Sequence, residues 1–372
     1  LDAIRHLETA LEIDPQNLKY LYTIGDFYYE QNYLDQGVKI FELIISIKPE
    51  DYNGYYNLAG FLNKQKKYEQ SLLNYHRVLE LHENNINTIY NIGAILIDTK
   101  KYENAIQYFQ KVIDSQPNSD DALNNLGFLY LELNGVENAI EYLNRAISIN
   151  PNNFNALNNL GKAYEKKSLF QEAIECFDAV IHLKPDYAEA YSNRGVALQE
   201  LRRIDEAINH FDKAISLDPE NAEANHNKSL ILLLRGEFKK GWELYKWRWG
   251  ISASSTERFH TKIPHWDGIN ADKSLNIFLW AEQGIGDEIF YFGMLKNFFK
   301  IDSRVIISSD KRLHGIFKRS MPKVEFIDRK KIDTEFIEST IDFQAPMGDL
   351  GYFYSVNKIF DANQHKPFLH VH

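Results

Sequence analysis

The chain has 372 residues, enough for two or three ordinary domains, and a net charge of −10 at neutral pH. Hydrophobic residues make up 44% and charged residues 25%, a composition that is typical of a folded globular protein and excludes a largely disordered one. From Ile251 onward 16 basic and 16 acidic residues balance, so the acidic excess lies before Ile251. An acidic surface repels phosphate backbones, which argues against nucleic acid as a partner.

Cys176 is the single cysteine, so an internal disulfide and a thiolate metal cluster are both excluded. No catalytic histidine or asparagine motif accompanies it, and we expect a small core residue. The histidines are scattered, and we predict neither a metal nor a cofactor. The longest apolar runs, such as Leu230–Leu234 and Ile277–Trp280, are too short to span a bilayer. We predict no membrane span and a cytoplasmic location.

Prolines recur along the first two thirds of the chain with a spacing of 34 residues and one gap of 68. They are Pro15, Pro49, Pro117, Pro151, Pro185 and Pro219, with Glu83 in the vacant slot. A small-residue series and a large apolar series keep the same period, exemplified by Gly161 and Phe177. Small residues permit two helix backbones to approach closely, and proline ends the second helix. The period therefore predicts stacked helical hairpins.

One repeat satisfies the pattern L-x2-L-G-x2-Y…A-x3-F…P in full. Its residues are Leu157, Leu160, Gly161, Tyr164, Ala173, Phe177 and Pro185. On these residues the chain resembles the tetratricopeptide-repeat (TPR) family. We expect an all-α superhelix, an α-solenoid, over residues 1–250. It would contain a partial repeat (1–17), full repeats (18–51, 52–85, 86–119, 120–153, 154–187 and 188–221) and a degenerate repeat (222–250).

Asparagine recurs at one position in the first helix of the repeats, and this column is Asn57, Asn91, Asn125, Asn159, Asn193 and Asn227, with Thr23 in the first slot. A carboxamide offers both a donor and an acceptor, so it can grip an extended peptide backbone regardless of sequence. The column resembles the asparagine ladder of O-linked N-acetylglucosamine transferases, which implies a protein or peptide partner on the concave face. Alternatively, the asparagines simply tie neighbouring helices together.

After Gly250 the helical period stops, and residues 251–274 read as a connector. Leu275–Trp280, Val305–Ser308 and Val324–Ile327 are short apolar runs, separated by helical segments at Glu288–Lys300 and Arg312–Ser320. Strands that alternate with helices predict a parallel α/β sheet over residues 275–372. Such sheets bind ligands at the carboxyl ends of their strands.

The Gly-rich segment Ala281–Asp287 follows the first of these strands, and it is expected to form a tight loop. Together with Trp242–Trp249 and Pro264–Gly268, it resembles bacterial TPR proteins fused to a glycosyltransferase of the heptosyltransferase type. Ile341–Met347 matches that family loosely. The resemblance implies a Rossmann-like α/β domain that forms the first half of a two-lobed GT-B fold.

By this resemblance Asp287 is the catalytic base, and substrate contacts come from four residues of the same loop: Glu282, Gln283, Gly284 and Gly286. Alternatively Asp287 caps the following helix, and its neighbours only shape the turn. The second lobe, which holds the nucleotide-sugar site, does not follow within the chain, so we expect these 372 residues alone to be inactive.

The leading interpretation is therefore a TPR scaffold that recruits a polypeptide acceptor for transfer from a nucleotide sugar. A nucleotide sugar is expected only if a second lobe exists. The rivals are a non-enzymatic scaffold whose α/β segment is a degenerate cap and a repeat-only adaptor whose partner docks on the tryptophan cluster near Trp242.

Overall fold

A computed structural model describes residues 9, 11, 13–251, 258–268, 275–282, 284–295 and 304–356. The structure divides into two compact units, Leu1–Pro185 and Asp186–His372, and each is described by itself. Across the described residues no helix is both long and apolar enough to cross a membrane.

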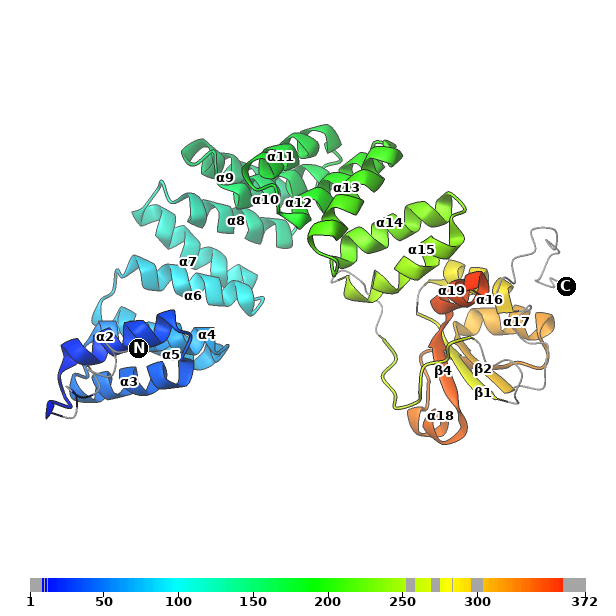
Figure 1. The fold of residues 1–372 in the computed structure, drawn as a ribbon, viewed down its shortest axis with the longest axis horizontal. Coiled ribbons are helices and arrows are strands. Elements are labelled where there is room, and N and C mark those ends of the chain that lie inside the picture. Colours follow the sequence, from blue (N-terminus) through cyan, green and yellow to red (C-terminus); the bar gives the residue numbers. More distant parts are fainter. Residues whose placement is uncertain are drawn as a thin grey trace. The chain divides into compact units, whose positions relative to one another are not determined.

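The first unit consists of helical hairpins whose paired helices lie antiparallel (Figure 1). The pairs are α2 (Leu18–Glu30) with α3 (Leu34–Ile47), α4 (Tyr52–Lys64) with α5 (Tyr68–Leu81), α6 (Ile86–Asp98) with α7 (Tyr102–Ser115), α8 (Asp120–Glu132) with α9 (Val136–Ile149), and α10 (Phe154–Lys166) with α11 (Phe170–Leu183). In each pair the first helix has 13 residues and the second has 14, as the strict period predicts.

The helix ends repeat with the same period. Each first helix begins after a side chain that accepts a backbone N–H of the first turn; these residues are Asn17, Asp51, Asn85, Ser119 and Asn153. A residue in the left-handed conformation lies two positions after the end of each first helix, such as Lys66 at φ 59°. The Lys66 N–H donates to the Asn63 carbonyl (2.8 Å) and the Lys67 N–H to the Leu62 carbonyl (2.9 Å). This closes the turn between the helices.

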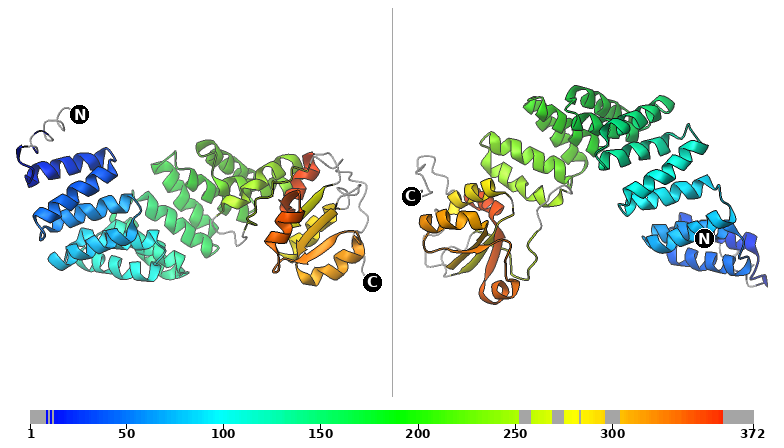
Figure 2. Two further views of the ribbon diagram at one scale, coloured as in Figure 1. Left: turned by 90° about the horizontal axis from the view of Figure 1, so that it is seen from below. Right: turned by 180° about the vertical axis from the view of Figure 1, so that it is seen from behind.

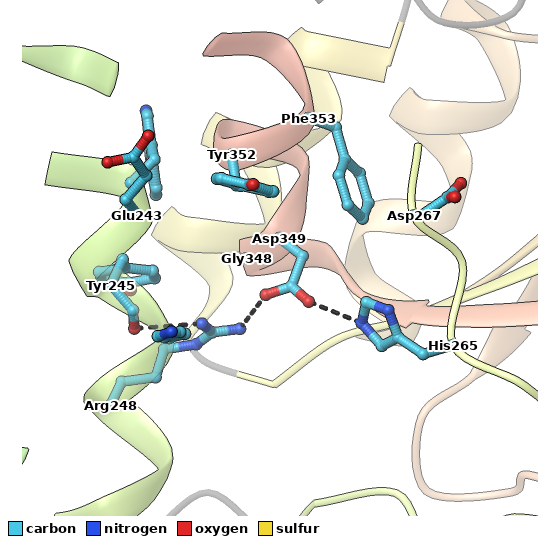
Figure 3. A pocket seen from close by; sticks show the side chains of 11 residues that line it. Glu243, Tyr245, Arg248, His265, Asp267, Gly348, Asp349, Tyr352 and Phe353 are labelled. Atoms are coloured by element: carbon cyan, nitrogen blue, oxygen red, sulfur yellow. Dashed lines mark hydrogen bonds and ion pairs between the residues drawn. The ribbon is translucent and has the colours of Figure 1, made fainter. Parts of the chain in front are cut away.

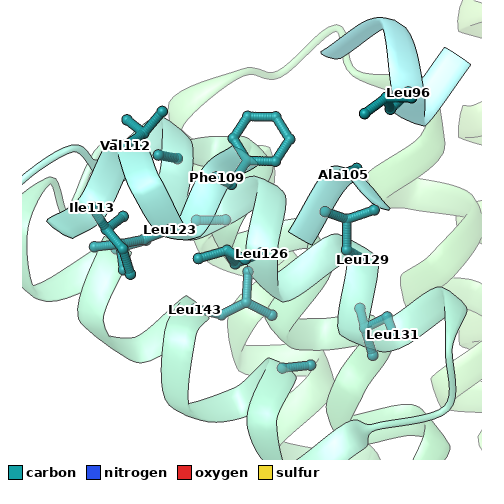
Figure 4. Close-up of a cluster of buried hydrophobic side chains, with 14 of the residues drawn as sticks. Leu96, Ala105, Phe109, Val112, Ile113, Leu123, Leu126, Leu129, Leu131 and Leu143 are labelled. Atoms are coloured by element: carbon teal, nitrogen blue, oxygen red, sulfur yellow. The ribbon is translucent and has the colours of Figure 1, made fainter. Parts of the chain in front are cut away.

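The small-residue series lies where the two helices of a repeat approach closely. A Cβ atom built on Gly161 would lie 2.5 Å from the Phe177 ring, and one on Gly93 would lie 2.9 Å from the Phe109 ring. Both rings are fully buried. Figure 4 shows Phe109 in the continuous core that neighbouring repeats build together.

We therefore expect Gly161→Ala to destabilise the first unit, although alanine favours helix. Overpacking costs about 1–3 kcal/mol, more than the ~0.5–1 kcal/mol that alanine contributes in a helix. Gly60, also inside a helix, is the matched control, because the nearest atom to its added Cβ is the Tyr75 hydroxyl at 4.0 Å. Gly60→Ala should raise the free energy of unfolding measured in urea. If both variants have a higher free energy of unfolding than the wild type, the small residues are not required by close packing of the helices.

The second unit begins with two further hairpins and a short 3-10 helix. These are α12 (Ala188–Glu200) with α13 (Ile204–Leu217), α14 (Ala222–Leu234) with α15 (Phe238–Tyr245), and η1 (Lys246–Gly250). An α/β segment follows: β1 (Asn276–Trp280), α16 (Ile285–Leu295), β2 (Arg304–Ser309), η2 (Lys311–Leu313), α17 (His314–Ser320), β3 (Glu325–Asp328), α18 (Thr334–Thr340), β4 (Phe343–Pro346), η3 (Met347–Asp349) and α19 (Leu350–Val356).

The four strands form a parallel sheet in the order β3-β2-β1-β4, with Leu279 paired to Ile307 on one side and Ala345 on the other. Alternate strand residues face opposite sides. Leu279 and Ile307 share a core with residues of α16, α17 and α19, whereas Phe278 packs with Ile337 of α18. Figure 2 shows the strands of the sheet side by side in two further views. The predicted parallel sheet is confirmed. The Rossmann-like half of a GT-B fold remains a prediction.

The last hairpin packs directly on the α/β segment. Trp242 and Tyr245 belong to the same buried cluster as Leu279 of the sheet. A Cβ on Gly351 of α19 would lie 2.3 Å from the Trp242 indole, so only glycine permits this approach. The degenerate repeat and the α/β segment thus share one core.

Candidate functional site

The asparagine column lies on the first helices of the repeats, and its members in the first unit are half-buried. Asn91 Nδ2 donates to the Tyr56 and Tyr75 hydroxyls, each at 3.1 Å. Asn125 Nδ2 donates to the Tyr90 hydroxyl at 3.0 Å, and Asn159 Nδ2 donates to Asn124 Oδ1 at 2.9 Å. In all three repeats one partner lies 35 residues earlier, so the amide nitrogens tie each repeat to the previous one.

The carboxamide oxygens of the same three asparagines, Asn91, Asn125 and Asn159, have a different environment. Among the described residues they accept no hydrogen bond, and they are not buried, so they reach solvent. Each tied asparagine therefore leaves one oriented acceptor on the first-helix face. Asn57 differs, because its Nδ2 donates to the Asn53 carbonyl of its own helix at 3.0 Å.

The two asparagines of the column in the second unit lie on α12 and α14. Asn193 is buried, with 6% of its surface exposed, and Asn227 is half-buried. The peptide-binding role predicted for all six asparagines remains a prediction.

The loop after β1 is shorter than predicted, because a helix begins before the predicted loop ends. Helix α16 begins at Ile285, so Gly286 and Asp287 lie in its first turn. The Asp287 carboxylate accepts the Gly284 N–H at 3.2 Å, and Asp287 is exposed. This is half of a capping box, in which the third helical residue reaches back to the residue before the helix. The cap gives Asp287 a structural role, and the catalytic role predicted for it remains a prediction.

Gly284 and Gly286 are not required by packing. A Cβ on Gly284 would meet only Asp287 Oδ2, at 3.6 Å, and one on Gly286 would meet no described atom within 4 Å. Gly286 has no positive φ. The backbone here is open at the carboxyl edge of the sheet, where a ligand can approach it. Gln283, the remaining predicted contact, lies outside the described residues.

Glu282 is buried and forms an ion pair with Arg248 of η1. Its oxygens accept from Arg248 Nε at 3.0 Å and Nη2 at 3.2 Å. The side chains are 1% and 6% exposed, respectively. Burial raises the pKa of Glu282, although the guanidinium opposes this shift. The pairing supports the alternative that Glu282 shapes the turn and does not contact an acceptor substrate.

Asp349 and His265 complete this ion-pair network. The sequence predicted neither as a site residue, although His265 lies within the segment Pro264–Gly268. Asp349 Oδ1 accepts from Arg248 Nη2 at 2.7 Å, and Oδ2 lies 2.8 Å from His265 Nε2. Figure 3 shows the Asp349 carboxylate between the Arg248 guanidinium and the His265 ring. Burial opposes ionisation, but the His265 hydrogen bond and Arg248 outweigh it, so the pKa of Asp349 is lowered. Arg248 and His265 lie 101 and 84 residues before Asp349 in the chain, so no local sequence motif predicts these contacts.

A second charged cluster lies at the carboxyl ends of β2 and β3. Glu288, with 1% of its side chain exposed, accepts the Asp310 N–H and Arg329 Nη1, each at 2.8 Å. Burial raises the pKa of Glu288, although these two donors oppose the shift. Asp310 also pairs with Arg312 at 2.8 Å. The cluster joins the start of α16 to the neighbouring strands. No group of three or more potential metal ligands occurs in the described part of the chain.

Cys176 is buried in the core of the first unit, as expected from the sequence. Burial raises the pKa of its thiol to about 12, so almost no thiolate forms at neutral pH. We expect Ellman's reagent at pH 8 to react with Cys176 only after urea unfolds the chain. Rapid reaction of the native protein would contradict a buried, protonated thiol.

Comparison with known families identifies the repeats. Models of the tetratricopeptide repeat match residues 154–187 and 188–221, residues 18–51 and 86–119, and residues 108–141, and a model described as a TPR repeat matches residues 129–168. Four of these ranges coincide with predicted repeats. The repeats within the matched ranges are therefore tetratricopeptide repeats, as predicted, and these matches all lie between residues 18 and 221.

Individual proteins show the same likeness. Protein FlbA of Caulobacter vibrioides is 29% identical over 134 residues, which cover 32% of this chain and 22% of that protein. A tetratricopeptide repeat protein from Parabacteroides merdae is 17% identical at a TM-score of 0.55, with 64% and 94% of the two chains covered. PilF of Pseudomonas aeruginosa is 17% identical at a TM-score of 0.51, with 57% and 96% covered. The two structures show the fold alone.

Proposed function

We propose that the TPR region of this chain binds an extended polypeptide along its first-helix face by accepting hydrogen bonds from the peptide backbone. A solenoid of such repeats is a scaffold for protein interaction. The proposal is carried by the solvent-accessible Oδ1 atoms of Asn91, Asn125 and Asn159, which are held in place by their Nδ2 ties. A backbone N–H is present at every peptide residue except proline, so such acceptors bind without regard to sequence.

Binding is tested with peptides selected on the wild-type protein from a phage-displayed library. Each lost hydrogen bond contributes about 0.5–1.5 kcal/mol, so replacing Asn91, Asn125 and Asn159 by alanine should weaken the selected peptides about tenfold to a thousandfold. Replacing them by aspartate keeps an acceptor oxygen but removes the Nδ2 ties that orient it, so the affinity should fall less than in the alanine variant. N-methylation of the peptide backbone should weaken binding to the wild type.

Asn74→Ala is the matched control, because this half-buried asparagine lies on the second helix α5 and donates only within its own helix, to Gln70 O at 2.8 Å. Its Kd should equal that of the wild type. If the triple alanine variant binds the selected peptides as tightly as the wild type while remaining folded by circular dichroism, the proposal is wrong.

The open backbone at Gly284 and Gly286 favours a second candidate, in which the α/β segment supplies the acceptor side of a sugar-transfer site. Asp287 would then take the proton of the acceptor hydroxyl. Its exposed carboxylate at the carboxyl edge of the sheet suits this role, and the glycines leave room for a substrate.

The test measures transfer from a panel of nucleotide sugars by the full natural protein. Asp287→Asn should abolish transfer. Asp333→Asn, the same change at the residue that caps α18, should not. Transfer that survives Asp287→Asn would eliminate Asp287 as the base.

A further inference from the structure

The second unit contains a cavity of about 600 Å³ between its last hairpin and its α/β segment. Trp242 and Tyr245 line it from α15, Arg248 from η1, His265 from the segment before β1, and Asp349 and Phe353 from η3 and α19 (Figure 3). This volume is in the range of small-molecule sites.

The cavity lies at the point where the order of the sheet reverses. β1 pairs with β2 on one side and with β4 on the other, and all are parallel. Asp349 follows the carboxyl end of β4, and its partner Arg248 also holds Glu282, which follows β1. The crevice between two such strands is the place where open α/β sheets bind ligands.

The charged side chains that line the cavity have both signs: Arg248 and Lys246 are basic, and Glu243, Asp267 and Asp349 are acidic. The lining therefore does not select an ion of one sign, and this favours a neutral ligand. Arg248 and His265 both contact the Asp349 carboxylate, so it presents no isolated charge. Figure 3 shows the carboxylates of Glu243 and Asp267 directed away from Asp349. A carboxylate has about four acceptor positions, so Asp349 can still accept further hydrogen bonds. His265, 44% exposed at its side chain, keeps its second ring nitrogen for a ligand.

Aromatic side chains also line the cavity. Tyr352 is 39% exposed, and Phe353 packs against Trp266 with ring centroids 5.2 Å apart. A hydroxyl group donates to a carboxylate and accepts from an N–H, and a sugar ring also presents C–H faces that pack on aromatic rings.

We propose that this cavity binds one or two sugar rings of a neutral saccharide. Asp349 and His265 hydrogen-bond adjacent hydroxyls, and Tyr352 packs against the ring. The inference goes beyond peptide binding and requires no sugar transfer. It can therefore be tested separately from both candidate functions.

The test is saturation-transfer NMR on the full chain with methyl glycosides of the common hexoses and N-acetylhexosamines at millimolar concentration. Choline and inorganic phosphate serve as cationic and anionic probes. We expect a saccharide signal that Tyr352→Ala and His265→Ala each weaken at least fivefold. Because both side chains are exposed at the cavity, neither change should unfold the unit.

Phe290→Ala removes an aromatic ring that is 55% exposed and does not line the cavity, and it should leave the signal unchanged. Asp287→Asn and the triple asparagine variant should also bind the saccharide normally, which separates this site from the two candidate functions. Absence of a saccharide signal, a signal that survives both cavity variants, or binding of choline or phosphate alone would overturn the proposal.

Discussion

Replacing Arg248 by alanine should lower the free energy of unfolding of the second unit by about 3–5 kcal/mol, because it leaves buried carboxylates without their cation. Glu282 would lose its charged partner, and Asp349 would retain only His265. The guanidinium also stacks on the Tyr245 ring, 4.7 Å from its centroid. Urea unfolding followed by tryptophan fluorescence measures the loss.

Arg304→Ala is the control for this prediction. Arg304 pairs with Glu325 at 2.7 Å, but both side chains are nearly half exposed, at 46% and 45%. Exposed pairs contribute about 0–1 kcal/mol, so this change should be almost silent. The double variant Arg248→Met, Glu282→Gln should recover much of the stability, since it removes both buried charges of the pair. A silent Arg248→Ala would show that this network does not stabilise the unit.

The repeats could be predicted from the sequence because their determinants are local and periodic. Gly161 and Phe177 lie 16 residues apart in one hairpin, and the same pair of positions recurs every 34 residues. A wrong register would place glycine opposite the wrong ring in every repeat at once. Three of the four strands, β1 to β3, were predicted for a related reason, since short apolar runs such as Ile277–Trp280 are typical of buried parallel strands. The fourth strand, β4, was not predicted.

The charged network could not be predicted, because only the folded sheet brings its members together. Arg248 follows the last hairpin, Glu282 follows β1, and Asp349 follows β4. The one available signal was an arginine between two tryptophans, Trp247 and Trp249. That position indicates a buried cation, but the neighbouring sequence does not predict which carboxylates pair with it.

The asparagine column shows a similar limit. The period identified the residues and both of their candidate roles. It could not show that the nitrogen and the oxygen of one carboxamide have different roles. In the structure the nitrogen of Asn125 ties two repeats together, while its oxygen remains available. The two roles are therefore compatible in one side chain.

The packing of the first unit leads to a second large effect, at Phe109. This ring is fully buried and packs edge-on against Tyr90, with centroids 5.3 Å apart. Phe109→Ala should lower the free energy of unfolding by about 3–5 kcal/mol, because a large cavity replaces the ring. Leu73→Ala, at a side chain that is 70% exposed on α5, should change it little. Hydrogen exchange should show lost protection first in α6 and α7, because repeats are stabilised mainly by their neighbours.

The same site permits a double-mutant cycle whose sign tests the steric argument. In the wild type a Cβ on Gly93 would lie 2.9 Å from the Phe109 ring, so Gly93→Ala should destabilise. In the Phe109→Ala background that ring is absent, and Gly93→Ala should stabilise by the ~0.5–1 kcal/mol that alanine contributes in a helix. The coupling between the two positions should then exceed about 1 kcal/mol. Additive effects would mean that glycine is present at this position for a reason other than the approach of the ring.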